Sequence, residues 1–354
     1  MLDYKKIFSL EPFGLSQKDK ENWYFKNQKK LSKYHYKNCK EYKKISDRIF
    51  KDISTCKNLS ELPFVHTKIF KEFNLRSVKI NSLSKTLTSS GTSNQITSQI
   101  NIDRKTSLLQ SKALLNIFSN LIKEKVTIFF VENPSTLAGA TSLSARGAAI
   151  RGFSQLSKNS VYLLDKNNNL KIEKLLKFLK KNPNEKFIIF GFTSLVWFLL
   201  IEKMKKNKIK IEKNNGILIH GGGWKKLKDK SVSRNIFNHN ISKNLGIKNI
   251  HNYYGMVEQT GSVFLECELG YFHTSIFSDV YIRDHNLNLA KNRNQGLVQV
   301  MSLLPLSYPG HNILTDDLGV VMGVDNCKCG RKGKFFSVIG RVPGTEKRGC
   351  SDVY

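Results

Sequence analysis

The segment from Thr86 to Asn94 has the residue types needed to bind a phosphate group. Seven hydroxyl or amide side chains surround Gly91 in this segment. Gly91 lets the backbone approach an anion, successive N–H groups can form a concave nest, and the hydroxyls can donate to phosphate oxygens. The spacing is not that of a Walker loop, so we expect a phosphate loop of another kind. Taken alone, the segment also fits a hydroxyl-rich surface loop.

A second set of residues has the types and spacing of a zinc site. Five residues separate Cys267 from His273, one residue separates Cys327 from Cys329, and glycines follow the pair. Three thiolates and one imidazole make a closed tetrahedral set, which is typical of structural zinc. We therefore expect a structural Zn²⁺ here. The alternative is four unrelated residues, with the cysteines buried as small apolar side chains.

Cys350 is a candidate nucleophile. It follows two cations, Lys347 and Arg348, and a glycine that allows a flexible backbone. Nearby positive charge favours the thiolate, which is the reactive form of cysteine. The alternative is an incidental cysteine in a disordered tail.

Other residues give ambiguous signals. His220 precedes a triple glycine and could approach a substrate carboxylate, but it fits a core position equally well. The apolar run from Gly191 to Leu200, and Trp224, could line an apolar pocket or pack in the core. The remaining histidines with no visible partner are interpreted as structural and given no role: His66, His251, His285 and His311.

The elements that must position these side chains alternate in type after about residue 85. Strand-like runs occupy residues 126–131, 187–190, 216–219 and 298–302. Amphipathic stretches with outward lysines occupy residues 107–123, 172–181, 195–206 and 232–245. This alternation predicts an α/β fold. Helix-like spacing before residue 80 predicts a helical N-terminal lobe, and short strands with turn residues after residue 279 predict a β-rich distal part.

Composition narrows the function classes. With 354 residues, 40% of them hydrophobic, the chain can bury a large core, which excludes a stapled mini-protein or a disordered chain. Lys and Arg total 58 against 28 acidic residues, but 47 of the 58 are Lys. Base reading favours Arg, so we interpret the net charge of +30 as compositional and expect no specific nucleic-acid partner. Attraction to an acidic protein, a nucleic acid or an anionic membrane surface is the alternative.

Targeting signals are lacking in the sequence. Residues 1–15 contain Asp3 and Glu11 and no apolar stretch of a secretory signal, so we expect a cytoplasmic protein. The longest apolar run, residues 187–201, is too short for a transmembrane segment. Six cysteines with one C-x-C pair do not resemble a secreted disulfide framework, and they favour metal binding or catalysis.

Several short motifs follow one another along the chain: a Ser/Thr/Gly loop, a glycine pair, a Tyr-Gly-x-x-Glu segment, a Thr-x-Asp and a Gly-Arg. With further characteristic segments they occupy residues 34–42, 61–64, 88–93, 222–227, 254–259, 307–310, 315–317, 340–341 and 348–352. Their order resembles the adenylate-forming enzymes, and most closely the LuxE-like acyl-protein synthetases of bacterial bioluminescence systems, and the resemblance covers nearly the whole chain.

The resemblance implies a role for each matching residue. It implies ATP and Mg²⁺ as cofactors, a fatty or other carboxylic acid as substrate, acyl-AMP as intermediate, and an acyl reductase or other acyl acceptor as partner. Cys350 would carry the acyl group as a thioester, and Glu258 would hold Mg²⁺. The implied nucleotide residues are Ser89, Ser90, Gly91 and Thr92 for the phosphates, Gly222, Gly223 and Tyr254 for adenine, and Asp317 and Arg341 for ribose, with Asp316 as the fallback.

The implied architecture is the large domain of an adenylate-forming enzyme with a truncated C-terminal segment. We expect a helical lobe over residues 1–85, an adenylation core over 86–341 and a short tail over 342–354 that carries Cys350. Full-length relatives of this superfamily have a further mobile domain with a catalytic lysine. From the resemblance we expect no counterpart to that domain after Arg341, so the lysine's role stays unassigned, with Lys347 suggested only by position.

Two other functions remain open from the sequence. An acyl-CoA ligase of the phenylacetate-CoA ligase type would keep the adenylation residues but would not need Cys350. A basic binding module with drifted motifs would not need Gly91, Glu258, Asp317 and Arg341.

Overall fold

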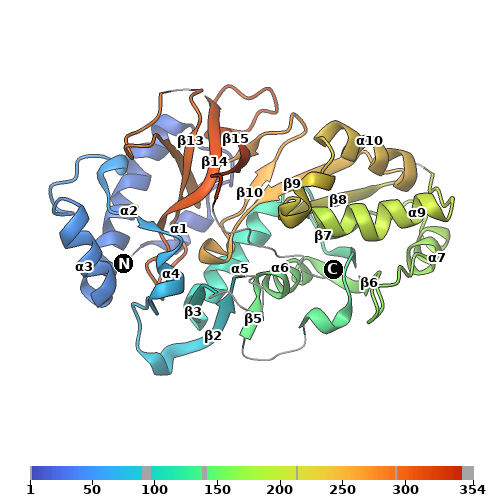
Figure 1. Cartoon of the computed structure of the whole chain (residues 1–354), viewed down its shortest axis with the longest axis horizontal. Coiled ribbons are helices and arrows are strands. Elements are labelled where there is room, and N and C mark those ends of the chain that lie inside the picture. The colour runs from blue at the N-terminus through green and yellow to red at the C-terminus, as the bar shows by residue number, and fades with distance from the viewer. Residues whose placement is uncertain (1, 90–96, 138–141, 213, 292, 345–354) are drawn as a thin grey trace. The chain divides into compact units, whose positions relative to one another are not determined.

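The computed structural model describes residues 2–89, 97–137, 142–212, 214–291 and 293–344 (Figure 1). These residues form two compact units, each described by itself below. The first unit contains residues 2–89, 97–117 and 255–344, and the second unit contains the described residues between 118 and 254. Within the described residues, no helix is both long enough and apolar enough to cross a membrane.

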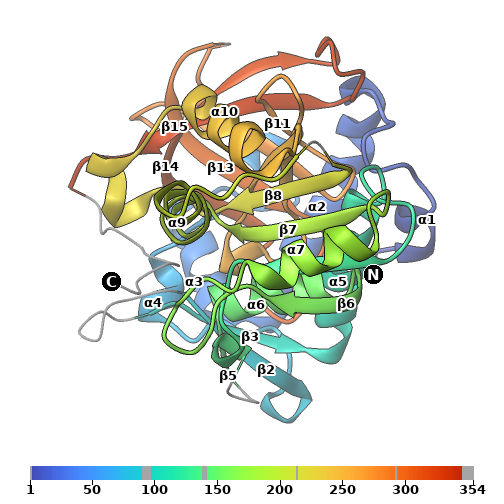
Figure 2. The same cartoon turned by 90° about the vertical axis from the view of Figure 1, so that its right-hand side faces the viewer.

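The second unit is built on a parallel sheet with strand order β9-β8-β7-β4-β6. Three of its strands are buried along their whole length, as expected for a parallel sheet covered on both faces. Figure 2 shows helices α7, α9 and α10 around these strands. The strands are β4 (Val126–Phe130), β6 (Ser157–Tyr162), β7 (Phe187–Phe192), β8 (Gly216–Gly221) and β9 (Asn249–Tyr254), with the short β5 (Ser142–Ser144) elsewhere.

Three helical segments of the second unit agree with predicted amphipathic stretches to within about two residues at each end. Residues 172–181 correspond to α7, residues 195–206 to the consecutive elements α8, η4 and α9, and residues 232–245 to α10. Helix α6 was not predicted. Ser233 accepts a hydrogen bond from the Ile236 N–H at the start of α10, and Gly246 ends it at φ 68°, a conformation that favours glycine. The elements are η3 (Pro134–Leu137), α6 (Ala145–Ser154), α7 (Glu173–Lys181), α8 (Thr193–Leu195), the π-helical η4 (Val196–Ile201), α9 (Glu202–Lys206), η5 (Lys225–Lys230) and α10 (Arg234–Leu245).

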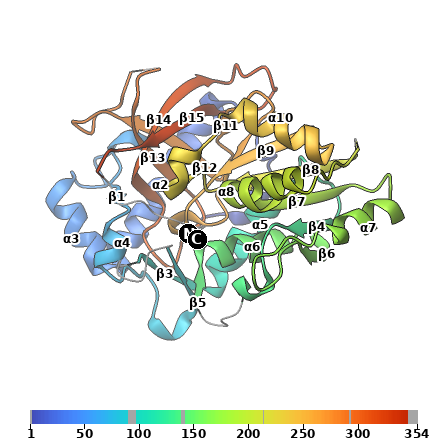
Figure 3. The same cartoon turned by 45° about the vertical axis from the view of Figure 1, so that its right-hand side comes forward.

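The first unit is built on an antiparallel sheet with strand order β12-β13-β14-β15-β11-β10. Strands β13, β14 and β15 can be followed in Figure 3. This confirms the β-rich distal part. The strands are β10 (Phe264–Glu266), β11 (Phe272–His273), β12 (Ser278–Arg283), β13 (Gly296–Ser302), β14 (Asn312–Val324) and β15 (Lys334–Arg341), while β2 (Leu83–Thr88) and β3 (Gln99–Asp103) pair separately.

Strand β14 is longer than its neighbours and has two partners along one edge. Its first residues pair in parallel with β1 (Val65–His66), and its later residues pair with β15, whereas β13 lies along the other edge. In the ladder His66 lies opposite Leu314, and Arg341 lies opposite Asp317. The end of β1 and the end of β15 therefore meet beside residues 314–317.

The helices of the first unit are mostly N-terminal, as predicted. Helix α5 begins at Arg104, three residues before the prediction, because the Asp103 carboxylate accepts the Thr106 N–H at 2.8 Å. It ends at Phe118 rather than 123, where the chain turns back. The elements are α1 (Tyr4–Phe8), α2 (Gln17–Asn38), α3 (Lys40–Ile49), η1 (Leu59–Glu61), α4 (Ile69–Glu72), η2 (Ile80–Ser82), α5 (Arg104–Phe118) and η6 (Val257–Gln259).

Helix α2 presents a largely polar face to the sheet of the first unit. Lys20 donates to the Ser278 carbonyl at 2.6 Å, and Gln28 donates to the Ser302 carbonyl at 2.9 Å. His35 stacks on His311 with ring centroids 4.7 Å apart, and both rings are fully buried. Burial lowers the pKa of His35 to about 3, against the opposing hydrogen bond to the Pro305 carbonyl, and burial together with His35 lowers the pKa of His311 well below its usual range.

This histidine pair predicts acid sensitivity of the fold. The unfolded chain binds a proton at each histidine below about pH 6.5, whereas the folded chain does not, so stability falls as pH falls through that value. Between pH 7 and 5 each buried ring should lower the free energy of unfolding by about 2 kcal/mol. The free energy of unfolding of His311→Gln should therefore fall by about 2 kcal/mol less than that of the wild type over this pH interval, as measured by urea unfolding.

The matched control is His285→Gln, which changes an exposed histidine of the same unit. It should follow the wild-type pH dependence. Parallel pH curves for His311→Gln and the wild type would contradict the prediction.

Candidate nucleotide and metal sites

The segment from Thr86 to Asn94, called the hydroxyl loop below, is connected at its base to Glu258 by hydrogen bonds. Strands β2 and β3 flank the loop, and the Ser89 N–H donates to the Ser98 carbonyl at 3.0 Å. The Ser98 N–H returns a bond to the Ser89 hydroxyl at 2.8 Å, and the Ser98 hydroxyl donates to Glu258 Oε1 at 3.0 Å. Two predicted site residues, Ser89 and Glu258, are therefore joined through Ser98, a residue without a predicted role.

Glu258 is held rigidly in the short helix η6. Its side chain is buried, and its backbone carbonyl accepts the Tyr308 hydroxyl at 2.9 Å. The neighbouring Gln259 donates to the Val300 and Gly310 carbonyls at 3.1 and 2.9 Å. A side chain at Gly310 would collide with the Tyr308 ring and the Glu258 carbonyl, so only glycine fits there. A buried carboxylate beside a hydroxyl loop has the ligand chemistry that Mg²⁺ prefers.

Arg341 lies between two neighbouring carboxylates. Its Nε is 3.1 Å from Asp317 Oδ1, and one of its terminal nitrogens is 3.4 Å from Asp316 Oδ2. The Asp317 N–H donates to the Thr315 hydroxyl, which itself donates to the Val298 carbonyl. The predicted pair of Asp317 and Arg341 is thus brought together by the β14–β15 register. Asp316 is the more buried carboxylate, and Asp317 is half-buried.

His66, a residue without a predicted role, is a partner of Asp316. Its Nε2 lies 3.2 Å from Asp316 Oδ1, while its Nδ1 accepts the Lys68 N–H at 3.2 Å. Because Nδ1 is an acceptor, the neutral ring carries its proton on Nε2 and donates it to Asp316. Burial alone would raise the pKa of Asp316, but the hydrogen bond from His66 and the charges of His66, Lys68 and Arg341 outweigh burial, and the pKa is lowered.

The remaining predicted nucleotide residues lie at the carboxyl ends of β8 and β9 in the second unit. Gly222 and Gly223 are exposed and have φ angles of 78° and 63°, so they turn the chain out of the sheet. Gly221 pairs with Tyr253, next to Tyr254, and its place on the sheet is filled by the Tyr253 ring. The carboxyl ends of parallel strands are where open α/β sheets bind ligands.

His220 and the apolar run have the contacts of core residues. The Thr193 hydroxyl donates to the Gly221 carbonyl at 3.0 Å and bonds His220 Nδ1 at 2.9 Å. Burial, with the charges of Arg234 and His251, lowers the pKa of His220 to about 3. Residues 192–201 lie mostly in the buried core of this unit, and the Trp224 ring packs edge-on against Trp197.

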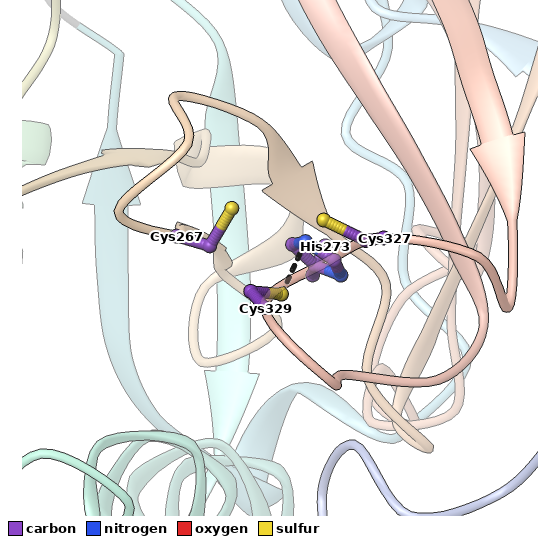
Figure 4. Close-up of side chains that lie close together, drawn as sticks. All are labelled: Cys267, His273, Cys327 and Cys329. Atoms are coloured by element: carbon purple, nitrogen blue, oxygen red, sulfur yellow. Dashed lines mark hydrogen bonds between the residues drawn. The ribbon is translucent and has the colours of Figure 1, made fainter.

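The four predicted metal ligands do come together in the first unit. One ligand atom from each of them lies within 4.8 Å of the other three. Figure 4 shows the four side chains gathered around one point. Cys267 and His273 are fully buried, Cys327 is 8% exposed and Cys329 is half-buried. Burial raises the pKa of the Cys329 thiol to about 12, and burial with Arg331 lowers the pKa of His273 to about 4.

Some predicted residues cannot be placed. Ser90, Gly91, Thr92 and Cys350 lie outside the described residues, as does much of the predicted tail. Their roles, and the proposed domain boundaries at residues 85 and 341, stay predictions.

Comparison with known proteins decides the family. Residues 2–354 match the acyl-protein synthetases described as LuxE. The chain belongs to the LuxE acyl-protein synthetase family. A curated relative of this synthetase is the long-chain-fatty-acid–luciferin-component ligase of Aliivibrio fischeri, which is 24% identical over 360 residues that cover 94% of this chain and 89% of the relative. The synthetase is therefore an AMP-forming ligase, as predicted.

Solved structures confirm the predicted fold. An open conformation of 2-hydroxyisobutyryl-CoA ligase, in complex with 2-HIB-AMP and CoA, matches with a TM-score of 0.71 and 15% identity over 90% of the synthetase and 74% of that chain. The same ligase in the thioesterification state matches with a TM-score of 0.70 and 14% identity over 94% of the synthetase and 70% of that chain. The synthetase thus has the fold of an adenylate-forming enzyme.

Substitutions at neighbouring glycines of the synthetase should change the free energy of unfolding by different amounts. A Cβ at Gly221 would lie 2.5 Å from the Tyr253 ring, so Gly221→Ala should lower the free energy of unfolding by about 1–3 kcal/mol through overpacking. Gly223 has open space around it, and its left-handed backbone is one that asparagine tolerates. Gly223→Asn should therefore stay within about 0.5 kcal/mol of the wild type in chemical denaturation. Equal losses in the two variants would contradict this assignment.

Proposed function

We propose that the synthetase activates a long-chain fatty acid with ATP, forms an acyl-AMP, and transfers the acyl group to Cys350 and then to a protein acceptor such as an acyl reductase. One observation carries the proposal most directly: the buried Glu258 is bonded to Ser98, which closes the hydroxyl loop. The pair of Asp317 and Arg341 on β14 and β15 supports it. The acid is proposed from the substrate named for the Aliivibrio fischeri relative.

The first step brings two anions together. A carboxylate oxygen of the acid attacks the α-phosphorus of ATP, and the bond to pyrophosphate breaks with its electron pair on the leaving pyrophosphate. Hydroxyls and N–H groups of residues 89–92 would hold the phosphates, and Glu258 would hold Mg²⁺. The metal supplies charge neutralisation when bound. Asp317 would accept ribose hydroxyls, with Arg341 fixed beside it, while Gly222, Gly223 and Tyr254 are the proposed adenine residues. Catalysis here is positioning and charge stabilisation.

The second step moves the acyl group. The Cys350 thiolate attacks the acyl carbon of acyl-AMP, a carbon–sulfur bond forms, and AMP leaves with the electron pair of the broken carbon–oxygen bond. The thioester keeps the acyl group reactive toward a nucleophile or reductant supplied by the acceptor protein. A CoA ligase would instead need CoA to accept the acyl group.

The test is to incubate the protein with ATP, Mg²⁺ and radiolabelled tetradecanoate in the absence of CoA. We expect AMP release and label on the protein that hydroxylamine removes. Cys350→Ser should keep acid-dependent exchange of pyrophosphate into ATP and lose the label. Label that appears only with CoA would favour the CoA ligase, and an absence of both exchange and label would refute ATP-dependent activation.

Glu258→Gln should slow pyrophosphate exchange by about 100-fold, because it removes the charge that would hold the metal in a buried site. Its melting temperature should stay near that of the wild type, since the amide can still accept the Ser98 hydroxyl. Glu266→Gln, which changes another buried glutamate of the first unit, is the matched control. An exchange rate in Glu258→Gln within about two-fold of the wild type would remove Glu258 from the site.

His66 is predicted to act as a positioning residue for Arg341. His66→Phe removes the donor to Asp316, so the buried carboxylate competes with Asp317 for the guanidinium. KM for ATP should rise about five-fold with kcat changed less than about two-fold. His66→Gln keeps an N–H donor and should restore most of the affinity. Equal effects of Phe and Gln, or an effect on kcat alone, would count against this role.

A further inference from the structure

The cysteine and histidine cluster is built from two turns of the same local design. In the first turn the Gly270 N–H donates to the Cys267 carbonyl at 2.9 Å, and Gly270 has φ 87°. In the second turn the Gly330 N–H donates to the Cys327 carbonyl at 3.1 Å, and Gly330 has φ 86°. In each, a glycine three residues after the cysteine takes the left-handed conformation that glycine favours. Two unrelated buried cysteines have no reason to share this geometry.

The spacing of the donor atoms fits a tetrahedral metal. With Zn–S bonds of about 2.3 Å, two sulfurs on one zinc lie roughly 3.8 Å apart. Donor atoms of all four residues lie within 4.8 Å of one another, and Cys329 Sγ is 3.4 Å from His273 Nε2. The other ring nitrogen of His273 is buried and makes no hydrogen bond to any part of the chain that the structure describes. A buried imidazole and three thiols with their donor atoms this close are the donor set of a metal.

We propose that Cys267, His273, Cys327 and Cys329 bind one Zn²⁺ ion with a structural role. Three sulfurs and one nitrogen complete the four-coordinate shell and leave no position for a substrate. The Phe335 ring covers one face of His273, with 5.6 Å between the ring centroids.

The ion would join two hairpin connections of the first unit. Cys267 and His273 lie on the β10–β11 connection and on β11, and Cys327 and Cys329 lie on the β14–β15 connection. The Asp325 carboxylate already holds the second turn, because it accepts the Gly333 N–H at 2.7 Å and the Gln17 N–H at 2.9 Å. The cysteines are therefore preorganised before the metal binds.

The cluster lies at the other end of the β14–β15 hairpin from Asp317, one of the proposed ribose residues. Asp317 lies seven residues before Val324, the last residue of β14, which is roughly 20 Å along an extended strand. The metal would therefore stabilise the hairpin without contacting the reacting groups, and this inference does not depend on the proposed function.

The experiment measures metal in the intact chain purified under reducing conditions. Elemental analysis should find about one zinc per chain. Replacement by Co²⁺ should give intense thiolate-to-cobalt absorption with the d–d bands of a tetrahedral site. Zinc below about a tenth per chain together with no cobalt–thiolate spectrum would overturn the proposal.

Variants test the ligand assignment. Cys327→Ser and His273→Ala should each lower the zinc content at least about five-fold and lower the melting temperature. The matched control is Cys56→Ser, which changes a buried cysteine outside the cluster and should keep the wild-type zinc content. A folded Cys327→Ser protein with full zinc would also overturn the proposal. If that variant fails to fold, the wild-type zinc content and cobalt spectrum still decide.

Discussion

The antiparallel register between β14 and β15 fixes which side chains meet at each end of this hairpin. At one end it sets Asp317 opposite Arg341, and at the other it joins the strands through the turn that holds Cys327 and Cys329. A shift of one residue would move each side chain to the opposite face of the sheet. Arg341 would then leave Asp317, so the proposed ribose pair depends on the same backbone hydrogen bonds as the hairpin itself.

Several elements of the first unit supply hydrogen-bond donors to buried carboxylates. An ionised carboxylate loses its hydration on burial and must be compensated by donors. Asp316 has His66 and Arg341 as partners, and the short strand β1 places His66 there by pairing with β14. Glu258 accepts a hydroxyl from Ser98 while its backbone is held by Tyr308. Each carboxylate is thus oriented by the fold itself, and in the proposed nucleotide site this orientation would lower the reorganisation that catalysis needs.

The sequence predicted the fold class and those elements whose signals are local, whereas helix α6 and strands such as β9 and β14 were not predicted. The strands β4, β7, β8 and β13, and the helices α7 and α10, follow from hydrophobic period and capping residues close in the chain. The pairing of Asp317 with Arg341 and the gathering of the four metal ligands were predicted from motif order and spacing. His66 was missed, because its partner Asp316 is 250 residues away and only the β1–β14 ladder joins them. Ser98 was missed because one serine in a polar stretch carries no distinctive signal.

The number of lysines does not reveal which of them are buried, just as local sequence did not reveal the distant partner of His66. Most lysines are exposed, yet Lys20 and Lys334 are buried on either side of Asp279, with Nζ atoms 3.8 and 3.1 Å from its carboxylate oxygens. Burial lowers the pKa of Lys20 to about 8, although the charge of Asp279 opposes this. Gln17 adds a hydrogen bond to Asp279 at 3.0 Å. These contacts connect α2 to β12 and β15, so a helix with few apolar residues is held by paired charges and hydrogen bonds.

Removing Asp279 would leave two buried cations without their shared counter-ion, and such a loss typically lowers the free energy of unfolding by about 3–5 kcal/mol. The net charge of +30 gives no indication of this arrangement.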